Sequence, residues 1–211
     1  MPLRDINKLT FYGNVVSGNC LKLRFVADFL GLDYDWVEID VVKGETQTEE
    51  FLGLNPVGKV PYARWPNGDA LPESNAIILH LAETNEGGEK LIPQSAFEKA
   101  QMVSWMFWEQ YSHEPAIAVR RYLKHLVNTP EDEIDPELLH KGRRALGVME
   151  LQLGNTEYLV GDKLSLADIA LVAYTRWAHQ GGFDLENFPA VRRWVSHVET
   201  DLGIEHAYGV A

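Results

Sequence analysis

The chain has 211 residues, 45% of them apolar, and a formal net charge of −12. This length and apolar content are enough for a substantial core, in one large domain or two small ones. The acidic balance argues against a nucleic-acid partner, because proteins that bind a phosphate backbone usually carry basic faces. The same charge repels small anions at long range, so an anion site needs positive charge close by.

The single cysteine, Cys20, excludes an internal disulfide framework. No secretory leader opens the chain, and no run approaches the roughly 20 apolar residues of a membrane helix. We therefore expect a cytoplasmic protein without membrane attachment. The seven histidines show no metal-ligand spacing, and the motifs of nucleotide-binding loops and hydrolases are absent. We expect no metal site and no prosthetic group.

Strand and helix patterns alternate in the first part of the chain. Residues 9–13 read as a strand, residues 21–30 carry apolar positions at helical spacing, and residues 34–40 alternate as a second strand. Such a pair of strands would be parallel, with a right-handed crossover. After an irregular polar segment, Asn67-Gly68 predicts a hairpin of two antiparallel strands. Ser74 then fits as the N-cap of a helix, which gives the order β-α-β, β-β-α with a mixed four-stranded sheet.

Strand signals largely end at a predicted linker over residues 88–93, which contains Gly88 and Pro93. From about Phe97 the pattern is helical, and further helices are predicted over the segments 137–153, 165–178 and 190–199. Ser165 and Asp168 form a capping box at the start of one of them. The second part of the chain should be an all-α bundle.

Three features of the first part point to one kind of site. Ser17 to Cys20 has C-x-x-C spacing at a strand-to-helix turn, with serine in the first place, and helix N-termini stabilise thiolates. Pro61 opens a strand, and a cis bond there would leave the backbone of Val60 free to pair with an extended peptide. The pair 73–74 could hold a zwitterionic amino-acid group, with its ammonium on the glutamate and its carboxylate on the serine. Taken alone, each feature more often has a structural explanation: the serine or the Glu-Ser pair as a helix cap, the cysteine as core packing, and the proline as the start of a strand.

Together these segments resemble the glutathione transferases, over nearly the whole chain. The resemblance is carried by SGNC, LNPVGKVP and LPESNAIILHLAE in the first part and by YLVGDKLSLADIAL in the second. It implies a thioredoxin-like domain over residues 1–87 and an all-helical domain over residues 94–211. It also implies a homodimer, glutathione as co-substrate in the first domain, and an electrophile pocket between the domains.

The resemblance assigns roles to individual residues. Ser17 matches the catalytic serine of the theta and zeta classes, whose hydroxyl donates a hydrogen bond to the glutathione sulfur, and Asn19 is an alternative donor. The remaining glutathione contacts are Val60 through its backbone, Pro61 as the family's cis-proline, Glu73 and Ser74 at the γ-glutamyl end, and Lys59 at the glycine carboxylate.

In the second part, FWEQYSHEPAIAVRR resembles a segment common in bacterial transferases, which predicts a bacterial source. Trp108, Tyr111 and Ser112 are candidates for the electrophile pocket, with packing as the alternative for the two aromatic residues. Asp168, together with Ser165, is expected to act in folding, at about 0.5 to 2 kcal/mol.

The function implied is detoxification by conjugation, in which glutathione thiolate attacks a hydrophobic electrophile. A glutathione-dependent isomerase of the zeta sort, a peroxidase or a disulfide reductase could use the same site. Gly18 and Asn19 stand where zeta enzymes carry serine and cysteine, and the glutathionyl-exchange classes would need cysteine in place of Ser17. A non-catalytic binding protein is the third possibility, although it need not retain the glutathione-binding residues. The electrophile cannot be read from the sequence.

Overall fold

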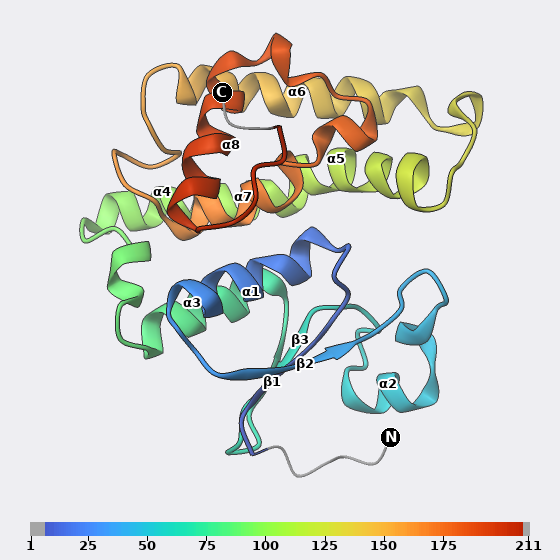
Figure 1. The fold of residues 1–211 in the computed structure, drawn as a ribbon, viewed down its shortest axis with the longest axis vertical. Helices are drawn as coiled ribbons and strands as arrows, with labels where there is room; N and C mark the ends of the chain where they lie inside the picture. Colours follow the sequence, from blue (N-terminus) through green and yellow to red (C-terminus); the bar gives the residue numbers. More distant parts are fainter. Residues whose placement is uncertain (1–6, 209–211) are drawn as a thin grey trace. The chain divides into compact units, whose positions relative to one another are not determined.

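The computed structural model describes residues 7–208 and divides into two compact units, one ending at Gly88 and one beginning at Glu89 (Figure 1). A four-stranded sheet with helices forms the first unit, and helices form the second. The predicted fold class is confirmed. Part of the segment predicted as a linker is a 3-10 turn at Gly88–Leu91.

The sheet of the first unit has the strand order β2-β1-β3-β4. Its strands are β1 (Leu9–Gly13), β2 (Tyr34–Glu38), β3 (Tyr62–Arg64) and β4 (Ala70–Pro72). The β1–β2 pair is parallel and is joined through helix α1 (Gly18–Phe29), whereas β3 pairs antiparallel with both β1 and β4. The predicted parallel pairing of β1 with β2 and the hairpin at Asn67-Gly68 are therefore confirmed.

Helices α1 and α3 (Ser74–Thr84) pack together on one side of this sheet (Figure 1). Phe11 from β1, Leu23 from α1 and Ile77 from α3 are fully buried where these elements meet. This packing brings the N-terminal ends of the two helices, which lie far apart in the chain, within reach of one another.

The polar segment before β3 is not irregular, contrary to prediction. It contains a 3-10 turn at Glu45–Gln47 and a short helix, α2 (Glu49–Leu54). The hydroxyl of Thr48 accepts a hydrogen bond from the backbone N–H of Phe51 at 3.3 Å, and the Phe51 side chain is buried. Capping and one apolar anchor form this helix, and six residues are too few to show a helical period.

Within the residues that the structure describes, the second unit contains five α-helices and two π-helical segments, Glu109–His113 and Tyr122–Leu126. The α-helices are α4 (Ala96–Trp108), α5 (Glu114–Arg121), α6 (Pro136–Leu153), α7 (Leu166–Thr175) and α8 (Pro189–Asp201). Short 3-10 turns occur at Glu131–Glu133, Ala178–Gly181 and Leu185–Asn187. Every residue of α7 is buried, and α4, α5 and α8 pack against it. The core of this unit is therefore centred on α7.

A buried carboxylate organises the start of α7. The Asp168 side chain is fully buried, and its Oδ2 accepts hydrogen bonds from the backbone N–H and the hydroxyl of Ser165, at 2.9 and 2.8 Å. Its Oδ1 accepts from the backbone N–H of Leu159 and from the indole Nε1 of Trp194, both at 2.9 Å. Burial raises the pKa of Asp168, and the donated hydrogen bonds oppose that rise. The predicted capping box is confirmed, and it extends to two partners outside α7.

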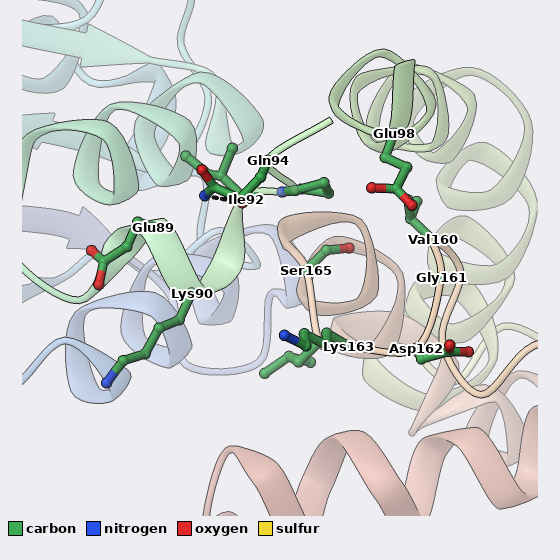
Figure 2. A pocket seen from close by; sticks show the side chains of 12 residues that line it. Glu89, Lys90, Ile92, Gln94, Glu98, Val160, Gly161, Asp162, Lys163 and Ser165 are labelled. Carbon is green, nitrogen blue, oxygen red and sulfur yellow. Dashed lines mark hydrogen bonds between the residues drawn. The ribbon is translucent and has the colours of Figure 1, made fainter. Parts of the chain in front are cut away.

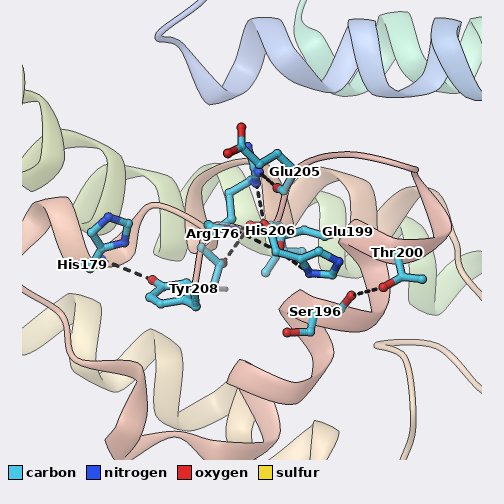
Figure 3. A network of polar contacts seen from close by, with 11 residues as sticks. Arg176, His179, Ser196, Glu199, Thr200, Glu205, His206 and Tyr208 are labelled. Atoms are coloured by element: carbon cyan, nitrogen blue, oxygen red, sulfur yellow. Dashed lines mark hydrogen bonds and ion pairs between the residues drawn. The ribbon is translucent and has the colours of Figure 1, made fainter. Parts of the chain in front are cut away.

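A second polar network fastens residues 205–207 to the second unit (Figure 3). Arg176 Nε and Glu199 Oε1 are 2.8 Å apart in a buried ion pair. Glu199 also accepts a hydrogen bond from the backbone N–H of Ala207 at 3.2 Å, and its Oε2 lies 3.3 Å from Nδ1 of His206. Arg176 donates to the backbone carbonyl of Glu205.

Residues 7–208 contain neither a membrane-spanning helix nor a cluster of metal-ligating side chains. No helix there combines the length and apolar content required to cross a membrane. Within the same residues, no cluster of three or more His, Cys, Asp or Glu side chains is arranged to hold a metal ion.

Candidate functional site

Hydrogen bonds of the Asn14 and Glu38 side chains hold the turn between β1 and α1. Asn14 Nδ2 donates to the carbonyl of Ile39 at 3.0 Å, and Asn14 Oδ1 accepts from the backbone N–H of Val16 at 3.1 Å. The backbone N–H of Val15 donates to Glu38 Oε1 at 3.1 Å. These bonds from β2 and the residue after it fix the backbone that leads into position 17.

Ser17 occupies the N-cap position of α1, with φ −87° and ψ 120°, but its side chain makes no cap hydrogen bond. The alternative reading of Ser17 as an ordinary capping side chain is therefore not supported. The side chain is half-buried, and the first turn of α1 carries no acidic residue. The positive end of the α1 dipole is thus not offset locally, which favours an anion beside Ser17.

Cys20 lies one turn further along α1 and is fully buried. Burial raises the pKa of its thiol to about 11, although the Ser17 side chain and the Asn14 backbone partly oppose this. The thiol is therefore protonated at neutral pH and enclosed in the core. Both properties favour a packing role for Cys20 over a nucleophilic one.

The loop before β3 is held by a buried asparagine. Asn55 is 2% exposed; its Nδ2 donates to the carbonyl of Lys59 at 2.8 Å, and its Oδ1 accepts from the backbone N–H of Val57 at 3.2 Å. The Lys59 residue is exposed, and the Val60–Pro61 peptide bond is cis. Asn55 therefore holds the loop that carries Val60 immediately before β3.

The start of α3 differs from the prediction by one residue. Glu73, not Ser74, occupies the N-cap position, because the helix begins at Ser74 itself. Glu73 adopts φ 69° and ψ 109°, on the left-handed side of the backbone map that residues with a Cβ rarely use. Such conformations are costly and occur preferentially at functional sites.

Ser74 joins the start of α3 to the start of α1. The Ser74 side chain is buried, and its hydroxyl donates to Asn19 Oδ1 at 3.2 Å. The predicted sulfur-binding turn and the predicted γ-glutamyl position therefore lie side by side, although 55 residues separate them in the chain.

Lys22 is a member of this cluster that the sequence analysis missed. Its side chain is fully buried, and its Nζ lies 3.4 Å from Ser74 Oγ and 3.2 Å from Asn75 Oδ1. A lysine on a helix normally extends its ammonium into water, so no local pattern marked this one as buried.

In the second unit, the predicted pocket residues lie on and just after α4. The rings of Trp105 and Trp108 meet edge to face, with 5.1 Å between their centroids. Ser112 is half-buried, whereas Tyr111 is 88% exposed and so is not part of the core of this unit. Nε2 of the buried His113 lies 2.9 Å from Thr175 Oγ1, which ties this histidine to α7.

A cavity of about 520 Å³ lies between the start of the second unit and the loop before α7 (Figure 2). Its lining includes charged residues of both signs, namely Glu89, Lys90, Glu98, Asp162 and Lys163. Trp108, Tyr111 and Ser112 do not line it, and Ser165 at its edge belongs to the capping box. This cavity is therefore not the predicted electrophile pocket.

Two family models match the chain. One, described as glutathione S-transferase, N-terminal domain, matches residues 16–84, and the other, glutathione S-transferase, C-terminal domain, matches residues 105–201. The glutathione S-transferase F10 of Arabidopsis thaliana is 33% identical over 153 residues, which are 70% of each chain. The chain belongs to the glutathione S-transferase family.

Three further proteins are similar to this glutathione S-transferase family member over about nine-tenths of its length. A glutathione S-transferase structure from Pseudomonas fluorescens has 43% identity, covers 91% of this chain and 94% of that one, and gives a TM-score of 0.86. The structure of Ure2p in complex with S-hexylglutathione has 25% identity, covers 92% of this chain and 98% of that one, and gives a TM-score of 0.80. The URE2 protein of Eremothecium gossypii is 26% identical over 90% of this chain, which spans 64% of that protein's length.

Proposed function

We propose that this glutathione S-transferase family member binds glutathione in its first unit, stabilises the thiolate and transfers it to a hydrophobic electrophile. The observation that carries the proposal is the contact of Ser74 with Asn19, 3.2 Å between Oγ and Oδ1. This hydrogen bond brings together the turn that would hold the sulfur and the helix end that would hold the γ-glutamyl group. Ure2p, a relative of the same fold, has been solved with a glutathione derivative bound.

Each part of glutathione has a counterpart in this unit. The α-carboxylate of the γ-glutamyl group would accept hydrogen bonds at Ser74 and the N-terminus of α3, and its ammonium would meet Glu73. The cysteinyl backbone would pair with Val60. Lys59 would bind the glycine carboxylate and supply local positive charge in a chain whose net charge is −12.

The role of Ser17 follows from the energy needed to ionise a thiol. A free thiol has a pKa of about 8.5, and each unit of decrease requires about 1.4 kcal/mol of preferential thiolate stabilisation. A hydrogen bond to a charged group contributes about 1.5 to 3 kcal/mol, and the end of α1 adds to it. Ser17 could therefore lower the pKa of the glutathione thiol by one to two units.

In the reaction, the thiolate sulfur attacks an electrophilic carbon and a carbon–sulfur bond forms. In a substitution the leaving group departs with its electron pair, and in an addition the adduct takes up a proton from water. We also infer that the protein acts as a cytoplasmic homodimer in detoxification, as the resemblance implies. Bacterial relatives, such as the one from Pseudomonas fluorescens, favour a bacterial source.

The test is calorimetric titration with glutathione, followed by steady-state assays with a chloronitroarene, an organic hydroperoxide and a small disulfide. We expect conjugation of the chloronitroarene, and a loss of about ten- to a hundredfold in kcat/KM for Ser17→Ala. Ser95→Ala is the matched control, because Ser95 caps α4 in the other unit through a bond from the Glu98 N–H. Its kcat/KM should equal that of the wild type.

Each alternative has its own result. If glutathione does not bind at millimolar concentration, the proposal is wrong. Binding without turnover of any substrate would indicate a non-catalytic binding protein, and turnover of the hydroperoxide or disulfide alone would indicate a peroxidase or a reductase. Full conjugating activity in Ser17→Ala would transfer the activating role to Asn19 or to the backbone.

A further inference from the structure

Lys22 is a lysine in a fully buried position, which is unusual for a charged side chain. Its side chain is 0% exposed, and a buried ammonium loses the hydration that stabilises its charge. Its Nζ also lies beside Ser74 and Asn75, the first two residues of α3. The N-terminus of a helix carries partial positive charge, so a cation there is unfavourable as well.

An anion that binds at the same place offsets both costs. An anion at the start of α3 would interact favourably with the helix end and with the nearby ammonium, inside a low-dielectric surrounding that strengthens both interactions. The proposed function places one anion there, the α-carboxylate of the γ-glutamyl group.

We propose that Lys22 is a positioning and specificity residue of the glutathione site, which makes the site select thiol peptides that carry a carboxylate at the γ-glutamyl end. The proposal rests on the proposed function and adds a residue and a selection rule to it. Lys22 need not touch the ligand, because it acts through the Ser74 hydroxyl and through its charge.

The hydrogen bonds give the route of this action. An ammonium has three donors and no acceptor, so in the contact with Ser74 the hydroxyl oxygen is the acceptor. A hydroxyl that accepts from a cation is a stronger donor through its own proton. Asn75, the next residue of α3, also holds the ammonium in place, because its Oδ1 accepts a hydrogen bond from Lys22 Nζ at 3.2 Å. Lys22 thus leaves the Ser74 proton for donation, now to Asn19 and, with ligand bound, to a carboxylate.

The test compares two peptides and three proteins by calorimetry. The peptides are glutathione and 4-aminobutanoyl-cysteinyl-glycine, which keeps the terminal ammonium and the thiol but lacks the α-carboxylate. The proteins are the wild type, Lys22→Met and Lys43→Met. Methionine matches the length of the buried lysine, and Lys43, whose side chain is 77% exposed, controls for loss of one positive charge from the same unit.

We expect the wild type to bind glutathione at least tenfold more tightly than the analogue. Lys22→Met should lose at least tenfold in glutathione affinity and less than twofold in analogue affinity, and Lys43→Met should bind both peptides as the wild type does. Circular dichroism checks that the variants are folded.

Three results would overturn the proposal. Equal losses for both peptides in Lys22→Met would mean that Lys22 only supports the fold. Equal affinities of the wild type for both peptides would mean that the site does not select the carboxylate, and this comparison needs no variant. If the wild type binds neither peptide at millimolar concentration, the proposed function itself fails, which is a different result from the other two.

Discussion

Asp168 offers the sharpest test of how the second unit is held together. Asp168→Ala removes the acceptor of four hydrogen bonds, three of which come from the backbone N–H groups of Leu159 and Ser165 and from the indole of Trp194. These three residues are 0 to 2% exposed, so water cannot readily replace the carboxylate. An unsatisfied buried donor costs about 1 to 3 kcal/mol. With partial relaxation, we expect a loss of about 3 to 5 kcal/mol in the free energy of unfolding.

The measurement is urea unfolding followed by circular dichroism, with Asp135→Ala as the matched control. Asp135 is exposed and caps α6 by accepting one hydrogen bond, from the Glu137 N–H at 2.9 Å. Asp135→Ala should therefore lower the free energy of unfolding by only about 1 kcal/mol. Folded Asp168→Ala should bind glutathione with unchanged affinity. Equal losses in the two variants would refute the reasoning, and so would a loss of activity without a loss of stability.

Three further expectations concern the first unit. Because burial raises the pKa of Cys20 from 9.0 to about 11, its stabilising contribution is complete below pH 9 and is lost as the pH rises through 11. The unfolding free energy of the wild type, measured in guanidinium at each pH, should fall by about 1.4 kcal/mol per pH unit more steeply than that of Cys20→Ala in this range; parallel slopes would contradict this. Asn55→Ala should cost about 1 to 3 kcal/mol in unfolding free energy and weaken glutathione binding in calorimetry, and unchanged affinity would show that the loop needs no such support. Gly13→Ala places a methyl carbon 2.6 Å from an indole carbon and should cost about 2 kcal/mol or more in urea unfolding, whereas Gly53→Ala meets no atom within 4 Å and should cost nothing; equal stabilities would refute the clash.

The elements that local patterns determine could be predicted from the sequence. A strand-like composition predicted β1, alternation predicted β2, helical spacing predicted α1, and Asn67-Gly68 predicted the hairpin. Each of these signals lies within a few neighbouring residues. Helix α2 was missed because six residues carry too little periodicity. The segment after Trp108 was predicted with regular helical spacing, but its π-helical turn changes the phase of the residues that follow.

The candidate site was predictable only as separate pieces. Ser17, Pro61 and Glu73 could be found because each stands at a turn or at an element boundary. The contact of Ser74 with Asn19 and the burial of Lys22 depend on how α1 packs against α3, and no local signal encodes that packing. The reach of Asp168 to Leu159 and Trp194 has the same origin, since those partners come from a loop and from α8.

The backbone of Glu73 has a consequence for how this chain could change under selection. A residue with a Cβ pays about 1 to 3 kcal/mol for such a conformation, and glycine adopts positive φ readily. Selection for heat resistance alone should therefore favour Glu73→Gly, which relaxes the backbone and deletes the carboxylate proposed to bind the ligand's ammonium. A population evolved in that way would gain stability and lose peptide binding in one step, so the glutamate persists only while binding is under selection.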